Sequence, residues 1–218
     1  MSIHKPLIAI VGPSGSGKST SLKGLNPAEV KILDGERKGF PFKGAEKYDI
    51  RPFESKADFD KVFEQTLKEE PKYIVVESLT KLALYIKSLC VNAYKGYDVW
   101  SNYSKMVRQV ITKAKNTKTT VIFTAIDEIV EIGQPDGSTV SKRMIGVEGQ
   151  ELKKQGGIEP DMLVIFFTNV AKTPQGIAYQ FETNNDGVTT AKSPMDMFPR
   201  FIPNDLATAL KKMEEYYS

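Results

Sequence analysis

The feature that most constrains the fold is an apolar run followed at once by a segment rich in glycine and serine. Residues 7–11 read LIAIV and residues 12–20 read GPSGSGKST. This spacing is typical of a phosphate-binding loop between a β-strand and a helix. The predicted phosphate-binding residues are Gly12, Pro13, Ser14, Gly15, Ser16, Gly17, Lys18, Ser19 and Thr20.

The chemistry of such a loop explains its residue types. The glycines let the backbone curl, so that successive N–H groups point toward phosphate oxygens. Lys18 supplies a positive charge for the β- and γ-phosphates, and the Ser19 hydroxyl is placed to ligate Mg²⁺. The helix that follows adds the positive end of its dipole. The loop therefore predicts binding of a nucleoside triphosphate.

The composition limits what else the chain can be. With 218 residues, of which 40% are hydrophobic, it can bury one good-sized core, so residues 1–218 are expected to form a single domain. The net charge of +3 predicts a mixed surface, and any nucleic-acid contact must come from local patches. The lone Cys90 excludes an internal disulfide, and the lone His4 cannot build a histidine metal centre. Without a signal peptide or a long apolar stretch, we expect a cytoplasmic protein with no membrane contact.

Apolar runs that alternate with helical patterns favour an α/β fold with a mostly parallel sheet. An alternating segment at 177–183 predicts an antiparallel edge strand near the C-terminus. A loop is expected over 35–51. The expected parallel strands are 7–11, 30–34, 73–76, 120–124 and 162–168, and the expected helices are 18–25, 55–69, 79–93, 98–115 and one from Asn204 or Asp205 onward.

After the fourth strand the pattern changes. A Pro-Asp-Gly turn at 135–137 separates two apolar segments, which predicts a projecting hairpin in a mobile region over 127–157. Its cations are candidates for contact with DNA or a second subunit, although a solvated loop is the alternative. No aromatic residue lies in 127–157, so this region offers no base-stacking platform of its own. The candidates are Lys142, Arg143, Lys153 and Lys154.

Three polar residues follow predicted strands, where open α/β sheets gather their ligands. Glu77 ends the third strand and is predicted to hold Mg²⁺ together with Ser19; the alternative is a strand-terminal acid without a ligand. Glu36 ends the second strand and is a candidate general base, or else a surface acid in an Asp-Gly turn. Thr124 ends the fourth strand, where it can sense the γ-phosphate or simply fill the strand.

Together these segments resemble the core of RecA-like ATPases. A strand also lies between the loop strand and the strand that ends at Glu77, as in P-loop proteins that use a strand-borne catalytic glutamate. The likeness is nearest to short, phage-encoded RecA-core recombinases that anneal single strands. It rests on Gly12–Thr20, Val30–Glu36, Ile74–Leu79 and Val121–Ala125, and extends more weakly over Gly146–Met197.

The resemblance implies a RecA-like domain that binds and hydrolyses ATP with Mg²⁺. In that family the acid matching Glu36 polarises water, and the acid matching Glu77, more often an aspartate, holds Mg²⁺ through water. The stretch after the fourth strand contacts DNA, which implies single-stranded DNA as a partner, with a further copy of the chain or a single-strand-binding protein as others. Ile126 or Asp127 stands where that family has a glutamine linking nucleotide to DNA.

Two other functions fit the same loop. GPSGSGKST also resembles the loop of guanylate kinase, but such kinases usually need several arginines, and this chain has only Arg37, Arg51, Arg108, Arg143 and Arg200. The third possibility is a nucleotide-gated assembly or DNA-packaging protein with little turnover.

Overall fold

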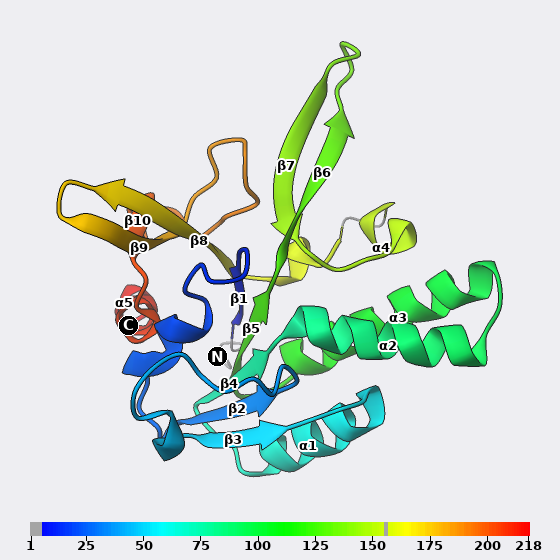
Figure 1. Ribbon diagram of the computed structural model, residues 1–218, viewed down its shortest axis with the longest axis horizontal. Helices are drawn as coiled ribbons and strands as arrows, with labels where there is room; N and C mark the ends of the chain where they lie inside the picture. Colours follow the sequence, from blue (N-terminus) through cyan, green and yellow to red (C-terminus); the bar gives the residue numbers. More distant parts are fainter. Residues whose placement is uncertain (1–5, 155–156) are drawn as a thin grey trace.

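A computed structural model describes residues 6–154 and 157–218, except for the side chains of Glu151 and Lys154. Its centre is an eight-stranded sheet in the order β10-β9-β8-β1-β5-β4-β2-β3 (Figure 1). The strands are β1 (Leu7–Val11), β2 (Val30–Asp34), β3 (Asp49–Pro52), β4 (Tyr73–Glu77), β5 (Thr120–Ala125), β8 (Val164–Thr173), β9 (Gly176–Glu182) and β10 (Phe201–Pro203).

The six strands from β8 to β3 pair in parallel, whereas β9 runs antiparallel to both β8 and β10. This arrangement confirms the predicted α/β class with an antiparallel edge near the C-terminus. In space it is β5 that separates the loop strand β1 from β4, while β2, which lies between them in the sequence, pairs on the far side of β4.

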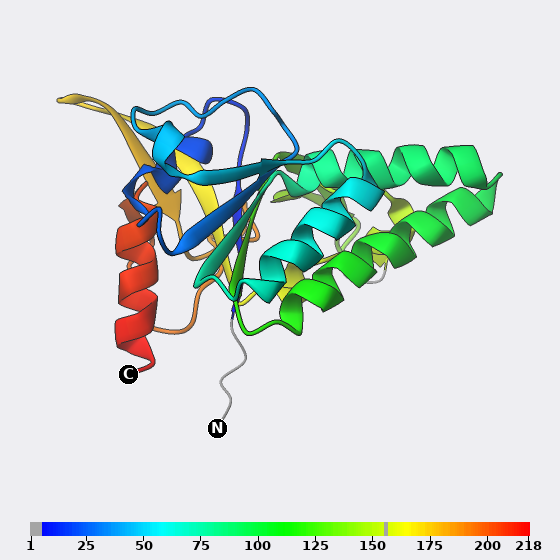
Figure 2. The same ribbon diagram turned by 90° about the horizontal axis from the view of Figure 1, so that it is seen from below.

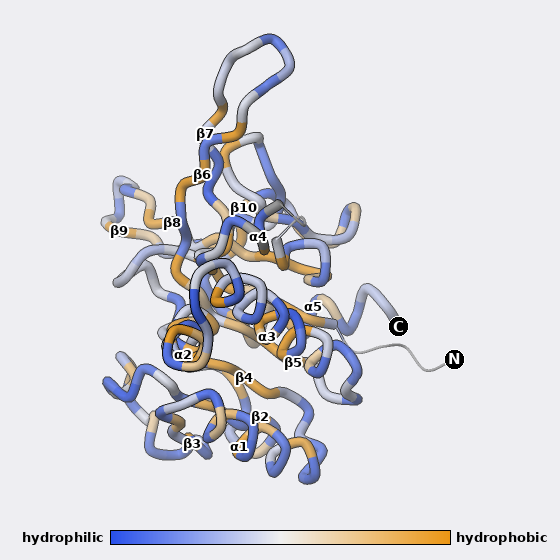
Figure 3. Tube along the Cα trace, turned by 90° about the vertical axis from the view of Figure 1, so that its right-hand side faces the viewer, coloured by the Kyte–Doolittle hydropathy of each residue, from blue (hydrophilic) through white to orange (hydrophobic). Residues whose placement is uncertain are grey.

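Helices cover both faces of the sheet. The helices α1 (Lys56–Lys68), α2 (Leu79–Ala93) and α3 (Tyr97–Lys115) lie on one face, and α5 (Leu206–Tyr216) lies on the other with a 3₁₀ helix at Ser19–Gly24 (Figure 2). Alternate residues of β1 therefore enter two different cores, with Ala9 in the first and Ile8 in the second. Burial on both faces explains the continuous apolar runs, which appear as orange stretches of the central strands in Figure 3.

Polar caps fix where several helices begin. The Ser55 hydroxyl accepts the N–H of Asp58 at 3.0 Å, and the Asp58 carboxylate accepts the N–H of Glu54 at the same distance. These two bonds at the start of α1 resemble a capping box, with Glu54 in place of the N-cap residue as the second donor. Ser78 caps α2 and Asp205 caps α5 through equivalent bonds to their first turns.

Four details differ from the sequence-based expectations. The segment after the loop is a six-residue 3₁₀ helix, shorter than the expected 18–25. The expected loop at 35–51 contains most of β3, and β10 was not predicted at all, because both are short edge strands without apolar alternation. Trp100, which the helical period of 98–115 places among inward-facing apolar residues, is 37% exposed, since the α2–α3 pair extends beyond the sheet (Figures 1 and 2).

The predicted hairpin is present as β6 (Asp127–Gly133) and β7 (Thr139–Ile145), a separate two-stranded ribbon that projects from the body (Figures 1 and 3). The Asp136 carboxylate accepts the N–H of Ser138 at 2.9 Å and fixes the turn. A short helix, α4 (Gln150–Lys154), follows. Among the helices of the described residues, none is long and apolar enough to cross a membrane.

Candidate active site

The phosphate-binding loop leaves β1 at the carboxyl end of the parallel strands. It borders a hollow of about 480 Å³, and the segment 38–41 forms the opposite wall. The hollow is lined by Ser14, Gly15, Gly17, Lys18, Ser19, Thr20, Lys38, Gly39, Phe40 and Pro41. Six of the nine predicted loop residues therefore face a space that is open to a ligand.

Gly12 lies at the most constrained point of the loop. Its φ is +157°, and a Cβ added to it would lie 1.8 Å from Oγ1 of Thr168 on β8. The Thr168 hydroxyl donates to the Ser16 hydroxyl at 2.6 Å, and the Gly12 N–H donates to the Ala125 carbonyl at 3.1 Å. Glycine at this position is thus required by the positive φ and by the close approach of Thr168 on β8.

Lys18 points back into the loop. Its Nζ donates to the carbonyl oxygens of Gly12 at 2.7 Å and Pro13 at 2.8 Å. Burial lowers the pKa of Lys18, while the carboxylates of Glu77, Asp127 and Glu36 oppose that change. The loop therefore holds the ammonium of Lys18 on two neutral carbonyl oxygens, which phosphate oxygens can replace.

The predicted metal-site residues lie side by side. The Ser19 hydroxyl donates to Oε1 of Glu77 at 2.6 Å, and the Glu77 carboxyl is buried. Its Oε2 has no hydrogen-bond partner within the described part of the chain. Burial raises the pKa of Glu77, and this effect outweighs the hydrogen bond from Ser19 and the charge of Lys18, which lower it. A hydroxyl beside an unpaired carboxylate oxygen is a donor set that suits Mg²⁺.

Glu36 lies beside Glu77, one strand away. The Ser78 hydroxyl donates to Oε1 of Glu36 at 2.6 Å, and Asp34 and Glu77 are paired in register on β2 and β4. The Asp34 carboxylate accepts the N–H groups of Glu36 and Arg37, both at 2.9 Å, which fixes the turn that presents Glu36. The Glu77–Ser78 peptide bond is cis. The three predicted catalytic residues, Lys18, Glu36 and Glu77, therefore converge on one edge of the sheet.

Thr124 is completely buried at the end of β5. Its hydroxyl donates to the Val76 carbonyl at 3.5 Å, and its position beside Glu77 opposes the rise in the pKa of that carboxyl. The side chain therefore contacts the acid of β4, and sensing of a γ-phosphate stays a prediction.

Two of the four predicted cations near the ribbon, Arg143 and Lys153, pair with carboxylates of the chain. Nε of Arg143 lies 2.8 Å from Oδ2 of Asp127, and its guanidinium stacks over the Phe167 ring. Lys153 pairs with Glu128 at 2.8 Å. Lys142 lies half-buried on β7, and the side chain of Lys154 is outside the described part of the chain. Arg143 thus anchors the ribbon to the body, which is a different position from that of a finger extended toward a neighbour.

Two residues that sequence reasoning missed border the loop at Gly17. The Asn204 amide donates to the Gly17 carbonyl at 2.9 Å across 187 positions of sequence, and its own N–H donates to the Tyr179 carbonyl. A Cβ on Gly17 would lie 3.1 Å from the ring of Tyr179. A half-exposed aromatic ring beside the loop offers a surface for the nucleotide base. No spacing in the sequence marks either residue, since only the fold brings them to the loop.

The loop between β1 and its helix, with carboxylates at the ends of β2 and β4 of a mostly parallel sheet, defines the class of P-loop ATPases. Residues 4–195 match the AAA domain family, and the chain therefore belongs to that family. Among solved structures, a KaiC-like protein from the hyperthermophilic archaeon Pyrococcus horikoshii OT3 has a TM-score of 0.46 at 13% identity, with 81% of this chain and 76% of that chain covered. No curated protein sequence matches the chain.

The burial of Glu77 leads to a prediction about pH and stability. Because the pKa of Glu77 is raised in the folded state, the carboxyl loses its proton at a lower pH in the unfolded chain than in the folded one. The free energy of unfolding therefore falls as the pH rises above the ordinary carboxyl pKa and through the raised pKa of the folded state. We expect the Glu77→Gln variant in EDTA at pH 8 to melt about 2–4 °C above the parent, the shift that about 1 kcal/mol gives at this size.

This difference should shrink toward pH 4, and added Mg²⁺ with a nucleotide should stabilise the parent more than the variant. Scanning calorimetry at the two pH values measures it. Glu131→Gln, on an exposed part of the ribbon, is the matched control. Equal melting temperatures of Glu77→Gln and the parent at both pH values would contradict the assignment of an ionised, unpaired carboxylate.

Proposed function

We propose that the chain hydrolyses ATP at this site and couples hydrolysis to single-stranded DNA, in recombination, annealing or replication of the phage type. One observation carries the hydrolytic part: two hydrogen bonds, from Ser19 to Glu77 and from Ser78 to Glu36, hold two carboxylates of neighbouring strands beside the phosphate loop. An ATPase needs one acid near the metal and another near the attacking water.

The residues divide the chemistry between them. The N–H groups of the loop and the ammonium of Lys18 neutralise charge on the β- and γ-phosphates. Glu36, less buried than Glu77, accepts a hydrogen bond from the attacking water and directs it in line with the bond to be broken. Mg²⁺, held by Ser19 and indirectly by Glu77, would supply further charge neutralisation on the phosphate oxygens.

The ribbon begins one residue after β5, close to the phosphate loop. Asp127 is one of the carboxylates that face Lys18, and it also pairs with Arg143 on β7. The Thr80 hydroxyl accepts the N–H of Ile126 at 3.0 Å and donates to the Gly146 carbonyl at 3.2 Å, which joins both ends of the ribbon to α2. We infer that Asp127 takes the linking role, so that release of phosphate shifts the ribbon and its grip on DNA.

The test is steady-state ATP hydrolysis by the full chain with and without a single-stranded oligonucleotide. We expect turnover that DNA increases several-fold and that double-stranded DNA of the same sequence does not. Turnover that is indifferent to DNA would contradict the coupling but not the hydrolysis. Tight ATP binding without turnover under either condition would favour a nucleotide-gated assembly role.

The arrangement of arginines argues against a nucleotide kinase. Four arginines pair with described carboxylates of the chain, and none of these four lines the hollow beside the phosphate loop. The pairs are Arg37 with Glu54, Arg51 with Asp49 and Glu69, Arg143 with Asp127, and Arg200 with Glu182 and Asp186. Transfer of phosphate from ATP to a nucleoside monophosphate would reverse this conclusion.

A further inference from the structure

A second hollow lies away from the phosphate loop, between the start of α3 and the segment that leads into α4. Its volume is about 490 Å³. Two aromatic rings of the first turn of α3 form one wall: Tyr97 is 68% exposed and Trp100 is 37% exposed. Its lining is Tyr97, Trp100, Glu128, Glu148, Gly149, Gln150 and Lys153. The fold thus supplies the aromatic rings that the region 127–157 lacks.

The Trp100 ring is held in place by its neighbours. Trp100 meets Tyr103 edge to face, with ring centroids 6.0 Å apart, and the Nζ of Lys87 lies 5.4 Å from the Trp100 centroid. A Cβ on Gly149 would lie 3.2 Å from the ring of Tyr103, so the segment that leads into α4 packs closely against α3. A preformed aromatic wall costs little entropy when a flat ligand stacks on it.

Charges inside this hollow are largely balanced. Glu128 pairs with Lys153 at 2.8 Å, and Glu148 pairs with Lys87. A site of this kind does not favour a phosphate group, but it suits a flat, uncharged ring with polar edges. Gln150 and the two carboxylates supply hydrogen-bonding groups for such edges. The chemistry is that of a nucleobase.

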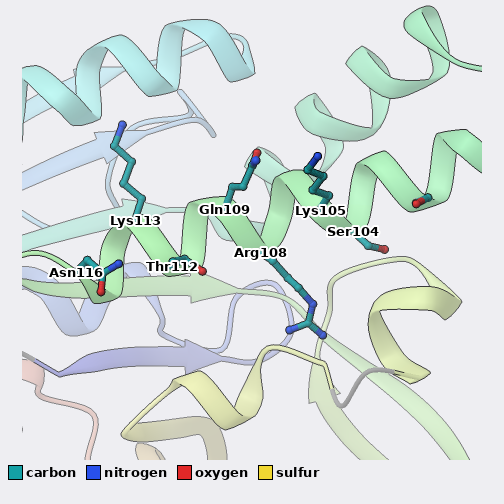
Figure 4. A pocket seen from close by; sticks show the side chains of 8 residues that line it. Ser104, Lys105, Arg108, Gln109, Thr112, Lys113 and Asn116 are labelled. Carbon is teal, nitrogen blue, oxygen red and sulfur yellow. The ribbon is translucent and has the colours of Figure 1, made fainter.

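A separate hollow with basic lining lies further along α3 (Figure 4). Lys105 and Lys113 project to one side of the helix and Arg108 to the other, and Lys113 also bonds Glu64 at 2.6 Å. Ser104, which is only 3% exposed, also lines this hollow, and its hydroxyl has no hydrogen-bond partner among the described residues. From Trp100 to Asn116 the helix runs about 24 Å at 1.5 Å per residue, which is room for several nucleotides.

We propose that single-stranded DNA binds along α3, with bases stacked on Tyr97 and Trp100 and with phosphates following Lys105. This inference rests on the proposed function, because it names the surface that receives its DNA. It assigns the contact with the DNA bases to α3, outside the ribbon. The α3 surface accepts any base sequence, since every base has a face to stack.

Trp100 is the only tryptophan of the sequence, so its fluorescence reports on this hollow alone. We expect quenching when a thymidine oligonucleotide of about 20 nucleotides is added, a length above the site size of most such surfaces. An abasic oligonucleotide of the same length, which keeps the phosphates, should not quench. The salt dependence of affinity should be steep, because phosphates displace counterions.

Tyr97→Ala should weaken DNA binding about ten-fold, which corresponds to about 1.4 kcal/mol, and should leave ATP hydrolysis without DNA unchanged. Lys105→Ala should reduce the salt dependence. The matched controls are Tyr217→Ala, at the residue that follows α5 on the other side of the molecule, and Lys61→Ala, an exposed lysine of α1.

The outcomes separate the two proposals. If fluorescence anisotropy detects DNA binding while Trp100 is not quenched and Tyr97→Ala binds normally, the α3 surface is wrong and the proposed function stands. If no DNA binds under any condition, both proposals fail. If RNA of the same length binds and DNA does not, the assignment of DNA as occupant is overturned.

Discussion

Replacing Lys18 with alanine is expected to lower the rate of ATP hydrolysis by at least about 10²–10³-fold, the usual cost of removing one preorganised donor to a transition state. The variant loses the ammonium that the carbonyls of Gly12 and Pro13 hold inside the loop. Affinity for ATP should also fall, because the ammonium contacts the phosphates before reaction as well as during it. Release of labelled phosphate measures the rate, and isothermal titration measures the affinity.

Lys23→Ala is the matched control, since Lys23 is exposed at the end of the same 3₁₀ helix. We expect this variant to retain the parental rate. Because the two carbonyls left by Lys18→Ala face an open hollow, water can satisfy them and the fold should persist. Hydrolysis by Lys18→Ala within a few-fold of the parent would sink the assignment of the site.

The second large effect is expected from Glu36→Gln. The amide keeps the size of the side chain and its hydrogen bond from Ser78, but it is a far weaker base. Turnover should fall about 10²–10⁴-fold, the usual contribution of general-base catalysis. ATP affinity should stay near that of the parent, because Glu36 acts on the attacking water. Single-turnover kinetics would separate the two quantities.

Glu46→Gln, on an exposed turn of the same loop region, controls for the loss of one negative charge. The ATP-bound state of Glu36→Gln should also persist long enough to compare the DNA affinity of ATP-bound and ADP-bound chains. Near-normal turnover by Glu36→Gln would show that another group directs the water. A parallel loss of ATP affinity would point instead to a structural role for Glu36.

The phosphate loop and both carboxylates could be predicted because local chemistry dictates them. A loop that wraps phosphate needs glycine where Thr168 approaches Gly12, and a lysine that reaches its centre. Glu36 and Glu77 follow strands whose apolar runs are visible in the sequence, and parallel strands bring such ends together. The hairpin was equally predictable from its Pro-Asp-Gly turn.

Contacts between residues that are far apart in the sequence could not be predicted in this way. Tyr179 and Asn204 reach Gly17 only because β9 and the start of α5 fold back beside the loop. Trp100 follows the helical period of buried residues, yet it is partly exposed because α3 begins beyond the edge of the sheet. Arg143 looked like a free cation in a loop, and its pairing with Asp127 depends on the register of the ribbon.

The in-chain pairing of four arginines has a consequence for how the molecule grips a polyanion. Guanidinium groups read phosphates and base edges through a rigid fork, whereas ammonium groups act as hydrated point charges. Because its own carboxylates pair with four of the guanidinium groups, a strand bound as proposed would meet the surface chiefly through lysines. Such contacts depend on the number of phosphates and not on the base sequence, so a bound strand could slide along the surface without full dissociation.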